Sequence, residues 1–330
     1  MKVLISVIIV DYKKKNPYLS ETFTALSKQT YTEFEVILLC DHPTNYHFKN
    51  LIQKHYDGVY TSPAKKRDDG AALAKGQILA FIDDDAYPDS KWLENIATKF
   101  NGHENLVAIG GPGITPPHVS LTEAASGWVS ASPLGSGPYG YRFMVASSRE
   151  VDDYPSMNLA VRKSVFNSVG GYDTNYWPGE DTKLCLDLIN KGGKIRYYPD
   201  VLVFHHRRPL FKKHLIQNGQ FGLHRGFFAR VLPQTSARVS YFAPSALLLG
   251  WIYLILASFI PTISIPIFLN LGKILTSLYL LAVLINSVWI GIKSSSILHF
   301  IISLISVPIT HLWYGGKFIQ GFLFTTKLTR

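Results

Sequence analysis

Apolar residues in the first 110 positions form short, β-branched runs, and most segments between these runs have helical spacing. The runs predict buried strands at residues 3–10, 35–40, 78–82 and 106–111. The segments between them predict helices at residues 17–30, 69–75 and 89–100, with a short helix at 51–56. Because strands that alternate with helices form parallel sheets, this pattern predicts an α/β domain.

The pattern changes after residue 111. Residues 112–138 are rich in Gly, Pro and Ser, which predicts a long loop. Helices are expected again at residues 164–170 and 182–190, and strands at 195–198 and 201–204. Residues 210–230 mix basic and apolar positions, which predicts an amphipathic helix or helix pair.

The last 90 residues are dominated by apolar runs. The runs at residues 242–260, 274–292 and 297–314 contain no Asp, Glu, Lys or Arg, and each is about long enough to cross ~30 Å of hydrocarbon. The shorter run at 263–271 is either a re-entrant piece or the start of a long, tilted second span. Buried core helices are the alternative. We therefore expect an α/β domain at residues 1–206, basic interface helices at 207–240, and about three transmembrane spans at 241–330.

Charge is divided as unevenly as hydropathy. Residues 201–330 contain twelve Lys or Arg and no Asp or Glu, whereas the first 200 residues contain 21 basic and 23 acidic residues. Basic charge beside long apolar runs favours a membrane with anionic lipids as the partner, and not nucleic acid. Two cysteines, Cys40 and Cys185, predict buried free thiols in a reducing compartment.

Seven basic residues precede the first apolar run. By the positive-inside rule they predict a multi-pass protein of the cell membrane with its N-terminal domain in the cytoplasm. Three spans would place Lys317, Lys327 and Arg330 on the opposite side, against the same rule. Either the last run does not cross, or residues 263–271 belong to an additional crossing.

Acidic residues follow three of the predicted strands: Asp11, Asp41 and the run from Asp83 to Asp85. Ligands of open α/β sheets bind at the carboxyl ends of strands, so these acids are expected on one edge of the sheet. Two such carboxylates can hold Mg²⁺ or Mn²⁺, which would neutralise a diphosphate leaving group. The structural alternative is a solvated acidic turn.

Several motifs resemble those of the family 2 glycosyltransferases. They run in family order from a first strand at residues 6–12 through Arg67-Asp-Asp-Gly70 to the strand and acid run GQILAFIDDD at 76–85. Downstream, residues 157–162, 170–173, 179–181 and 203–206 resemble the acceptor-side half. The resemblance covers about residues 3–230 and implies a GT-A fold, a Rossmann-like nucleotide-binding domain with a mixed sheet, followed here by helical transmembrane segments.

The resemblance implies a nucleotide-sugar donor and a divalent metal, Mn²⁺ or Mg²⁺. Asp41 would receive the base, Arg67 would lie near base or phosphate, Asp83 would contact ribose or metal, and Asp85 the metal. The remaining donor-side positions implied are Val10, Tyr12 and Asp84. Three departures affect the fine donor contacts: the sequence Val-Asp-Tyr-Lys at 10–13, Lys66 in place of a small residue, and Asp68 in place of Asn.

By the same resemblance, Asp181 would be the catalytic base with Glu180 beside it. A carboxylate that removes the proton of an attacking hydroxyl typically contributes ~10²–10⁴-fold. Acids at a helix start also suit the helix dipole, and the two interpretations are compatible.

Weaker assignments concern four residues. His205 would complete the metal shell and His206 would touch the diphosphate, or both histidines only pack. Trp177 would stack on the acceptor sugar or pack in the core. Arg225 lies in a degenerate Gln-x-x-Arg-Trp motif with Gly226 in place of Trp, and it would reach either the diphosphate or lipid headgroups.

The function expected is a membrane-anchored, inverting glycosyltransferase. It would move a sugar to a hydroxyl of a lipid-linked or cell-surface glycan. A polyprenyl-phosphate sugar synthase is the alternative, although a phosphate acceptor needs no base such as Asp181. A membrane scaffold with an inactive transferase domain is a third hypothesis, and the retention of Asp83, Asp85 and Asp181 argues against it.

Overall fold

The structure is a computed structural model that describes residues 4–11, 16–57 and 61–328. The chain forms two compact units. The first unit comprises Met1–Pro116 and Tyr141–His206, and the second comprises Pro117–Gly140 and Arg207–Leu328. Each unit is described below by itself.

The first unit is built on a mixed sheet in the order β3-β2-β1-β4-β9-β6-β10-β8. Parallel pairing joins β1 to β2 and β4, β2 to β3, and β6 to β10, whereas β9 runs antiparallel between β4 and β6. The strands of this sheet are β1 (Ile5–Asp11), β2 (Phe34–Cys40), β3 (Leu51–His55), β4 (Ile78–Asp83), β6 (Leu106–Gly110), β8 (Arg149–Val151), β9 (Asn158–Arg162) and β10 (Lys194–Tyr197).

A second, small sheet lies in the same unit. It has the order β5-β11-β7, from β5 (Ala86–Pro88), β7 (Gly113–Ile114) and β11 (Val203–His205). The helical elements of the first unit are α1 (Leu19–Ser27), α2 (Pro63–Leu73), α3 (Trp92–Phe100), η1 (Gly137–Arg142), α6 (Lys163–Ser168), η2 (Thr174–Tyr176) and α7 (Glu180–Asn190). The sequence boundary between the units, at Gly140 and Tyr141, falls within η1.

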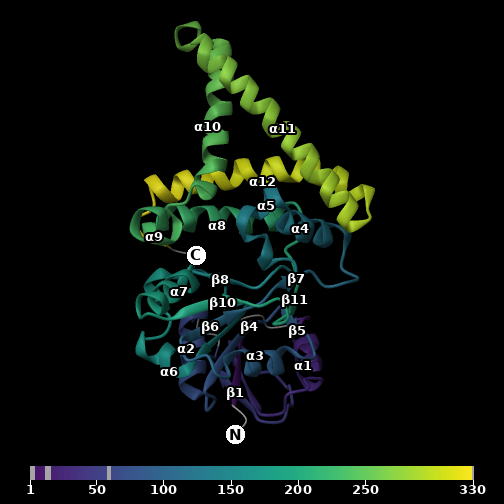
Figure 1. The fold of residues 1–330 in the computed structure, drawn as a ribbon, viewed down its shortest axis with the longest axis vertical. Coiled ribbons are helices and arrows are strands. Elements are labelled where there is room, and N and C mark those ends of the chain that lie inside the picture. Colours follow the sequence, from purple (N-terminus) through teal and green to yellow (C-terminus); the bar gives the residue numbers. More distant parts are fainter. Residues whose placement is uncertain (1–3, 12–15, 58–60, 329–330) are drawn as a thin grey trace. The chain divides into compact units, whose positions relative to one another are not determined.

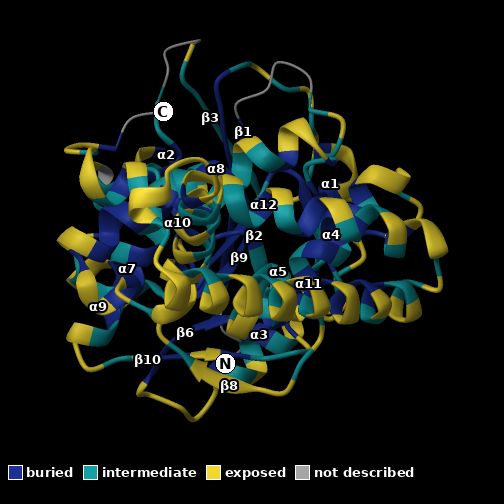
Figure 2. Cartoon of the chain, turned by 90° about the horizontal axis from the view of Figure 1, so that it is seen from above, coloured by how far each residue is buried: buried dark blue, intermediate teal, exposed yellow. Residues whose placement is uncertain are grey.

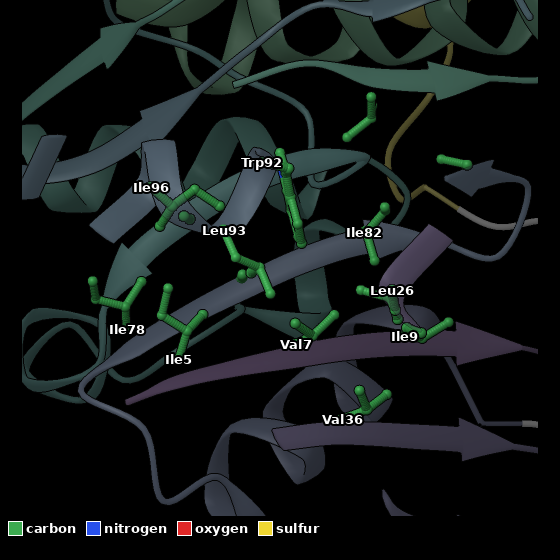
Figure 3. Close-up of a cluster of buried hydrophobic side chains, with 14 of the residues drawn as sticks. Ile5, Val7, Ile9, Leu26, Val36, Ile78, Ile82, Trp92, Leu93 and Ile96 are labelled. Carbon is green, nitrogen blue, oxygen red and sulfur yellow. The ribbon is translucent and has the colours of Figure 1, made fainter. Parts of the chain in front are cut away.

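The core of the first unit forms where the apolar strands meet α1 and α3. Every residue of β1 is buried, as expected for a strand covered on both faces. Figure 3 shows Trp92, Leu93 and Ile96 of α3 beside Ile5, Val7 and Ile9 of β1. Within this core the Trp92 indole N–H donates to Asn158 Oδ1 (2.9 Å), which ties α3 to β9. The sheet edge used by the site is therefore mounted on a packed core.

Two local predictions for this unit are wrong. Residues 51–56 form the edge strand β3 and not a helix, because β3 pairs in register with β2 from Val36↔Leu51 to Cys40↔His55. Helix α2 begins at Pro63, six residues earlier than expected, since Ser62 caps it by accepting a hydrogen bond from the Lys65 N–H. The antiparallel strand β9 makes the sheet mixed, as the family resemblance implies and as the alternation of strands and helices alone does not.

The second unit is helical. The segment expected to be a long loop at 112–138 instead contains α4, because the Ser120 hydroxyl accepts from the Glu123 N–H and caps a helix. The helices of the second unit are α4 (Leu121–Ala131), α5 (Pro133–Ser136), α8 (Lys212–Val231), α9 (Pro233–Ser236), α10 (Val239–Phe259), η3 (Pro261–Ile263), α11 (Pro266–Ser294) and α12 (Ile297–Leu323).

Helices α10, α11 and α12 are each long and apolar enough to cross a membrane. They are largely exposed within the chain, which Figure 2 shows as yellow along α11. The run at 263–271 forms no separate element of membrane length, because α11 begins at Pro266 and includes most of it. The predicted fold class, a mixed-sheet α/β domain followed by a helical apolar region, is confirmed.

Candidate active site

Strand register brings the acidic residues to one sheet edge. Val10 of β1 pairs with Asp83 of β4, and Asp11 pairs with Cys40, the residue before Asp41. The three strands therefore end at the same level, and Asp11, Asp41 and Asp83 project from neighbouring strand ends. This is the edge at which ligands of open α/β sheets bind.

A candidate metal group lies at this edge. Asp83, Asp85 and His205 each offer a ligand atom, and the three atoms lie within 4.8 Å of one another. His205 Nε2 is 3.0 Å from Asp85 Oδ1. The antiparallel pairing of β11 with β5, in which His205 pairs with Ala86, carries the histidine to Asp85. Two carboxylates and one imidazole suit Mn²⁺. Mg²⁺ is the alternative, although it is a harder cation that prefers oxygen ligands.

Asp84 is buried and bound to a different partner. The Asn16 side-chain amide donates to Asp84 Oδ2 (2.7 Å), to the Asp84 carbonyl (3.1 Å) and to Asp11 Oδ1 (3.1 Å). Asn16 thus fixes the turn between β4 and β5. The donor contact predicted for Asp84 stays a prediction.

Arg67 of α2 lies at the centre of a second acidic group. Its Nη1 donates to Glu180 Oε1 (2.8 Å) and its Nη2 to Asp83 Oδ1 (3.1 Å), while Asp181 Oδ1 is 4.0 Å from Nη1. The guanidinium is 11% exposed. One largely enclosed cation therefore links the start of α7 to the end of β4, which are almost 100 residues apart in sequence.

Glu180 and Asp181 begin helix α7 and differ in their contacts. Glu180 is buried and also accepts a hydrogen bond from the Gly179 N–H (2.9 Å). Asp181 is 26% exposed at its side chain, and its Oδ1 accepts from the Ser156 hydroxyl (2.5 Å). The Ser156 oxygen lies 2.5 Å from the Tyr172 hydroxyl. Asp181 is thus the more accessible of the two carboxylates, and the hydrogen bond from Ser156 fixes its position.

Burial dominates the electrostatics of this pair. Burial raises the pKa of Glu180 to about 7. The negative charge of Asp181 contributes to this rise, whereas the positive charge of Arg67 opposes it. Burial also raises the pKa of Asp181, and here Arg67 and the Ser156 hydroxyl oppose it. A carboxylate with a raised pKa is a stronger base near neutral pH.

The predicted base-binding residue Asp41 is engaged by a buried lysine. The side chain of Lys66 is 0% exposed, and its Nζ lies 2.5 Å from Asp41 Oδ1 and 3.3 Å from the Asp11 carbonyl oxygen. Val10 is buried in β1 beside this pair of strand ends. The predicted contact at Tyr12 lies outside the described residues.

The remaining assignments fall in different surroundings. His206 Nε2 is 2.9 Å from Glu21 Oε2, and its ring stacks on Tyr18 at a centroid distance of 4.0 Å. Trp177 is half-buried and lies just before α7. Arg225 belongs to the second unit, where its guanidinium donates to Ser236 Oγ (3.2 Å) and lies 5.0 Å from the Tyr241 ring centre. The roles predicted for these three residues stay predictions.

Sequence reasoning missed Asn16, Ser156 and Tyr172. Ser156 directly precedes the quoted motif at 157–162, and Tyr172 lies within the quoted Gly-Gly-Tyr-Asp motif, so their positions were visible although their contacts were not. Tyr172 also donates its backbone N–H to Asp68 Oδ1 (2.8 Å). These residues hold the acids in place and lack the charge that drew attention to the others.

The mixed sheet with its acidic edge defines a GT-A type domain, and the structure of another protein agrees. The mannosyltransferase PcManGT from Pyrobaculum calidifontis, solved in complex with GDP-Man and Mn²⁺, superposes with a TM-score of 0.59. The match covers 93% of this chain and 87% of that one at 16% sequence identity. At this identity the likeness shows the fold.

The sequence places the chain within that class. The model of glycosyl transferase family 2 matches residues 6–170, which is half of the chain, and the chain belongs to this family. The family predicted from the motifs is therefore confirmed.

Two curated relatives are similar over part of the chain. The pre-mycofactocin glycosyltransferase of Mycobacterium tuberculosis is 32% identical over 162 residues, 48% of this chain. The glucosyl-dolichyl phosphate glucuronosyltransferase of Haloferax volcanii is 26% identical over 212 residues, 58% of this chain. The matches span 33% and 64% of the relatives' own lengths.

Proposed function

We propose that this protein is a membrane-anchored, inverting glycosyltransferase. It moves a sugar from a nucleotide-sugar donor to a hydroxyl of a lipid-linked or cell-surface glycan. The observation that carries the proposal is one sheet edge with two adjoining groups, Asp83-Asp85-His205 and Arg67-Glu180-Asp181. The first group suits the donor and the second suits the acceptor.

Asp83, Asp85 and His205 would hold the divalent metal. Their donor atoms lie within 4.8 Å of one another, so the three side chains are close enough to share one small cation. A cation bound there supplies positive charge against the diphosphate of the leaving nucleotide. Two observations on related proteins support this part: the family, and the Mn²⁺ and GDP-Man in the solved mannosyltransferase.

Asp181 is the base in this proposal. Its carboxylate is partly exposed, whereas Glu180 is turned into the ion pair with Arg67. Ser156 donates to one Asp181 oxygen and so orients the other toward the acceptor hydroxyl, whose proton it takes during attack. Arg67 holds Asp83 and Glu180 together, and this fixes the distance between the donor and acceptor sides. Lys66 orients Asp41 toward the nucleotide base of the donor.

The acceptor and the location follow from the apolar helices. A lipid-linked glycan brings its acceptor hydroxyl to the membrane surface, and the Haloferax relative is named for a dolichyl-phosphate-linked substrate. The basic residues before α10 favour anionic lipids and a catalytic domain on the cytoplasmic side of the cell membrane.

The test is a transfer assay with the full chain in lipid nanodiscs. Nucleotide sugars are screened with Mn²⁺ or Mg²⁺ and polyprenyl-linked acceptors. We expect Asp181→Asn to reduce transfer at least ~10²-fold and Asp85→Ala to abolish the metal response. Asp187→Asn, on the same helix and paired with Lys183, is the matched control and should stay active. Full activity in both site variants would refute the assignment, and a product consisting only of mild-acid-labile polyprenyl phosphate sugar would establish the synthase instead.

A further inference from the structure

The second unit contains three apolar helices, yet their contacts differ in kind. Helices α10 and α11 form a hairpin whose tip is closed by the Tyr253 hydroxyl, which donates to the Ile263 carbonyl (3.2 Å). Tyr253 also packs against Phe268, with ring centres 6.4 Å apart. Figure 1 shows α12 running across the start of α10, and not beside it toward this tip. Consistently, Ser245 in the second turn of α10 donates to the Gly315 carbonyl of α12 (3.0 Å).

We propose that only α10 and α11 cross the membrane, and that α12 lies in the plane of the membrane surface. In this position one side of α12 packs against α8 and the other side contacts lipid. The proposal depends on the membrane anchoring proposed above and is independent of the reaction.

The partner of α12 is a polar helix. α8 and α12 run side by side in the same direction, from the His214–Thr310 contact (3.1 Å) to the Arg230 guanidinium, which donates to the Thr325 carbonyl. Between these ends the helices touch at backbone distance: an added Cβ at Gly222 would lie 2.6 Å from the Tyr314 carbonyl oxygen. α12 therefore cannot change its depth without α8.

This contact decides against a third crossing. Thr310 is the midpoint of α12, and the residue it contacts, His214, directly follows Lys212 and Lys213, both of which are exposed. If α12 crossed the bilayer, the two lysines would lie near its centre. Each lysine at that depth costs about 2.5–3.5 kcal/mol. At the membrane surface the same lysines meet lipid headgroups.

The exposed side of α12 fits a lipid surface. Every fourth residue along it is a large apolar side chain between 39% and 68% exposed. This stripe comprises Ile297, Ile301, Ile305, Ile309 and Trp313. The opposite side of α12, which includes Ser303, Ser306 and Thr310, is buried within the second unit, so the apolar stripe is the side left to face lipid.

Charge and length agree with two crossings. Of the twelve Lys and Arg residues after position 200, only Lys273 then lies on the far side, whereas a third crossing would add Lys317, Lys327 and Arg330 to it. The 21 residues of α10 span about 31 Å, which matches the hydrocarbon core, and the 29 residues of α11 cross it with tilt. The conflict with the positive-inside rule disappears.

Labelling of single cysteines tests the topology on the full chain. Native Cys40 and Cys185 are buried. Thr262→Cys at the hairpin tip, Thr326→Cys after α12 and Glu150→Cys on the first unit introduce exposed thiols for an impermeant maleimide in right-side-out and inverted vesicles. We expect Thr326→Cys to react from the same side as Glu150→Cys, and Thr262→Cys from the opposite side. Reaction of Thr326→Cys together with Thr262→Cys, or of all three from one side, overturns the proposal.

A depth measurement provides an independent readout. Ile297→Cys, Ile305→Cys and Ile309→Cys carry a fluorophore in vesicles containing lipids spin-labelled at two acyl depths. An in-plane helix predicts equal quenching ratios at the three positions. A spanning α12 would move residue 309 about 18 Å deeper than residue 297, because each residue rises 1.5 Å, and a graded ratio of that size would refute the proposal.

Discussion

Replacing Arg67 by Met tests how the acidic groups are held together. The guanidinium is only 11% exposed and contacts the buried Glu180 at 2.8 Å and Asp83 at 3.1 Å. Removal of one partner from a buried ion pair typically costs about 3–5 kcal/mol, because the remaining charge has no compensation. A carboxylate can escape that cost by taking up a proton. The destabilisation should therefore depend on pH, and its sign can be worked out from Glu180.

The pKa of Glu180 is about 7 in the folded protein against an ordinary value of 4.5. For a carboxyl with a raised folded pKa, stability is highest below pH 4.5 and falls as the pH rises to about 7, by about 3 kcal/mol. In the wild type this loss is complete above pH 7. Without Arg67, which opposes the rise, the pKa of Glu180 is higher still, so the variant keeps losing about 1.4 kcal/mol per pH unit above pH 7.

The assay is thermal unfolding of the full chain in detergent with a chelator, at pH 6 and pH 8.5. We expect the decrease in melting temperature caused by Arg67→Met to be at least twice as large at pH 8.5. Arg162→Met is the matched control, because Arg162 donates to the carbonyls of Phe100, His103 and Leu106 and to no carboxylate in the part of the chain that the structure describes. It should destabilise equally at both pH values. An equal decrease for Arg67→Met at the two pH values would refute the reasoning.

Three further changes test the metal group and the fold. His205→Ala should weaken Mn²⁺ affinity at least about tenfold, measured by calorimetric titration in the presence of a nucleoside diphosphate; unchanged affinity would remove the histidine from the group. Asn158→Leu removes the partner of the buried Trp92 indole N–H and the side-chain donor to the Val201 carbonyl, whereas the Gly111 carbonyl keeps the Tyr154 hydroxyl; the change should cost at least about 2 kcal/mol in thermal unfolding. Gly171→Ala should lower the melting temperature more than Gly170→Ala. Both glycines have positive φ, but only at Gly171 would a Cβ overlap Asp68, at 2.6 Å.

Hydrophobic periodicity was sufficient for the buried strands because β1, β2, β4 and β6 are covered on both faces and read as continuous apolar runs. It failed for β3, whose residues are all half-buried. An edge strand obtains its conformation from pairing with its neighbour, here β2, and its own sequence carries little of that information. The helix α4 was missed for a different reason, since the serine and glutamate of its cap were present in the sequence but were outweighed by Gly and Pro on either side.

The acidic members of the candidate site could be predicted because they lie at strand or helix boundaries that the sequence marks. Their partners could not. Asp85 and His205 are 120 residues apart, and they meet only through the antiparallel pairing of β5 with β11. Arg67 and Glu180 are 113 residues apart and meet across the sheet edge. Pairing between distant segments is the part of the site that one sequence does not contain.

The two departures from the family pattern in α2 have a common consequence. Lys66 replaces a small residue, and its ammonium group is compensated by Asp41 and by the Asp11 carbonyl. Asp68 replaces Asn, and burial raises its pKa to about 6 although the Tyr172 N–H opposes this. Both side chains of α2 thus form contacts that fix a neighbouring segment, Lys66 the ends of β1 and β2, and Asp68 the Gly-Gly turn before Tyr172. Because Arg67 lies between them, these contacts also fix the residue of α2 that joins Asp83 to Glu180.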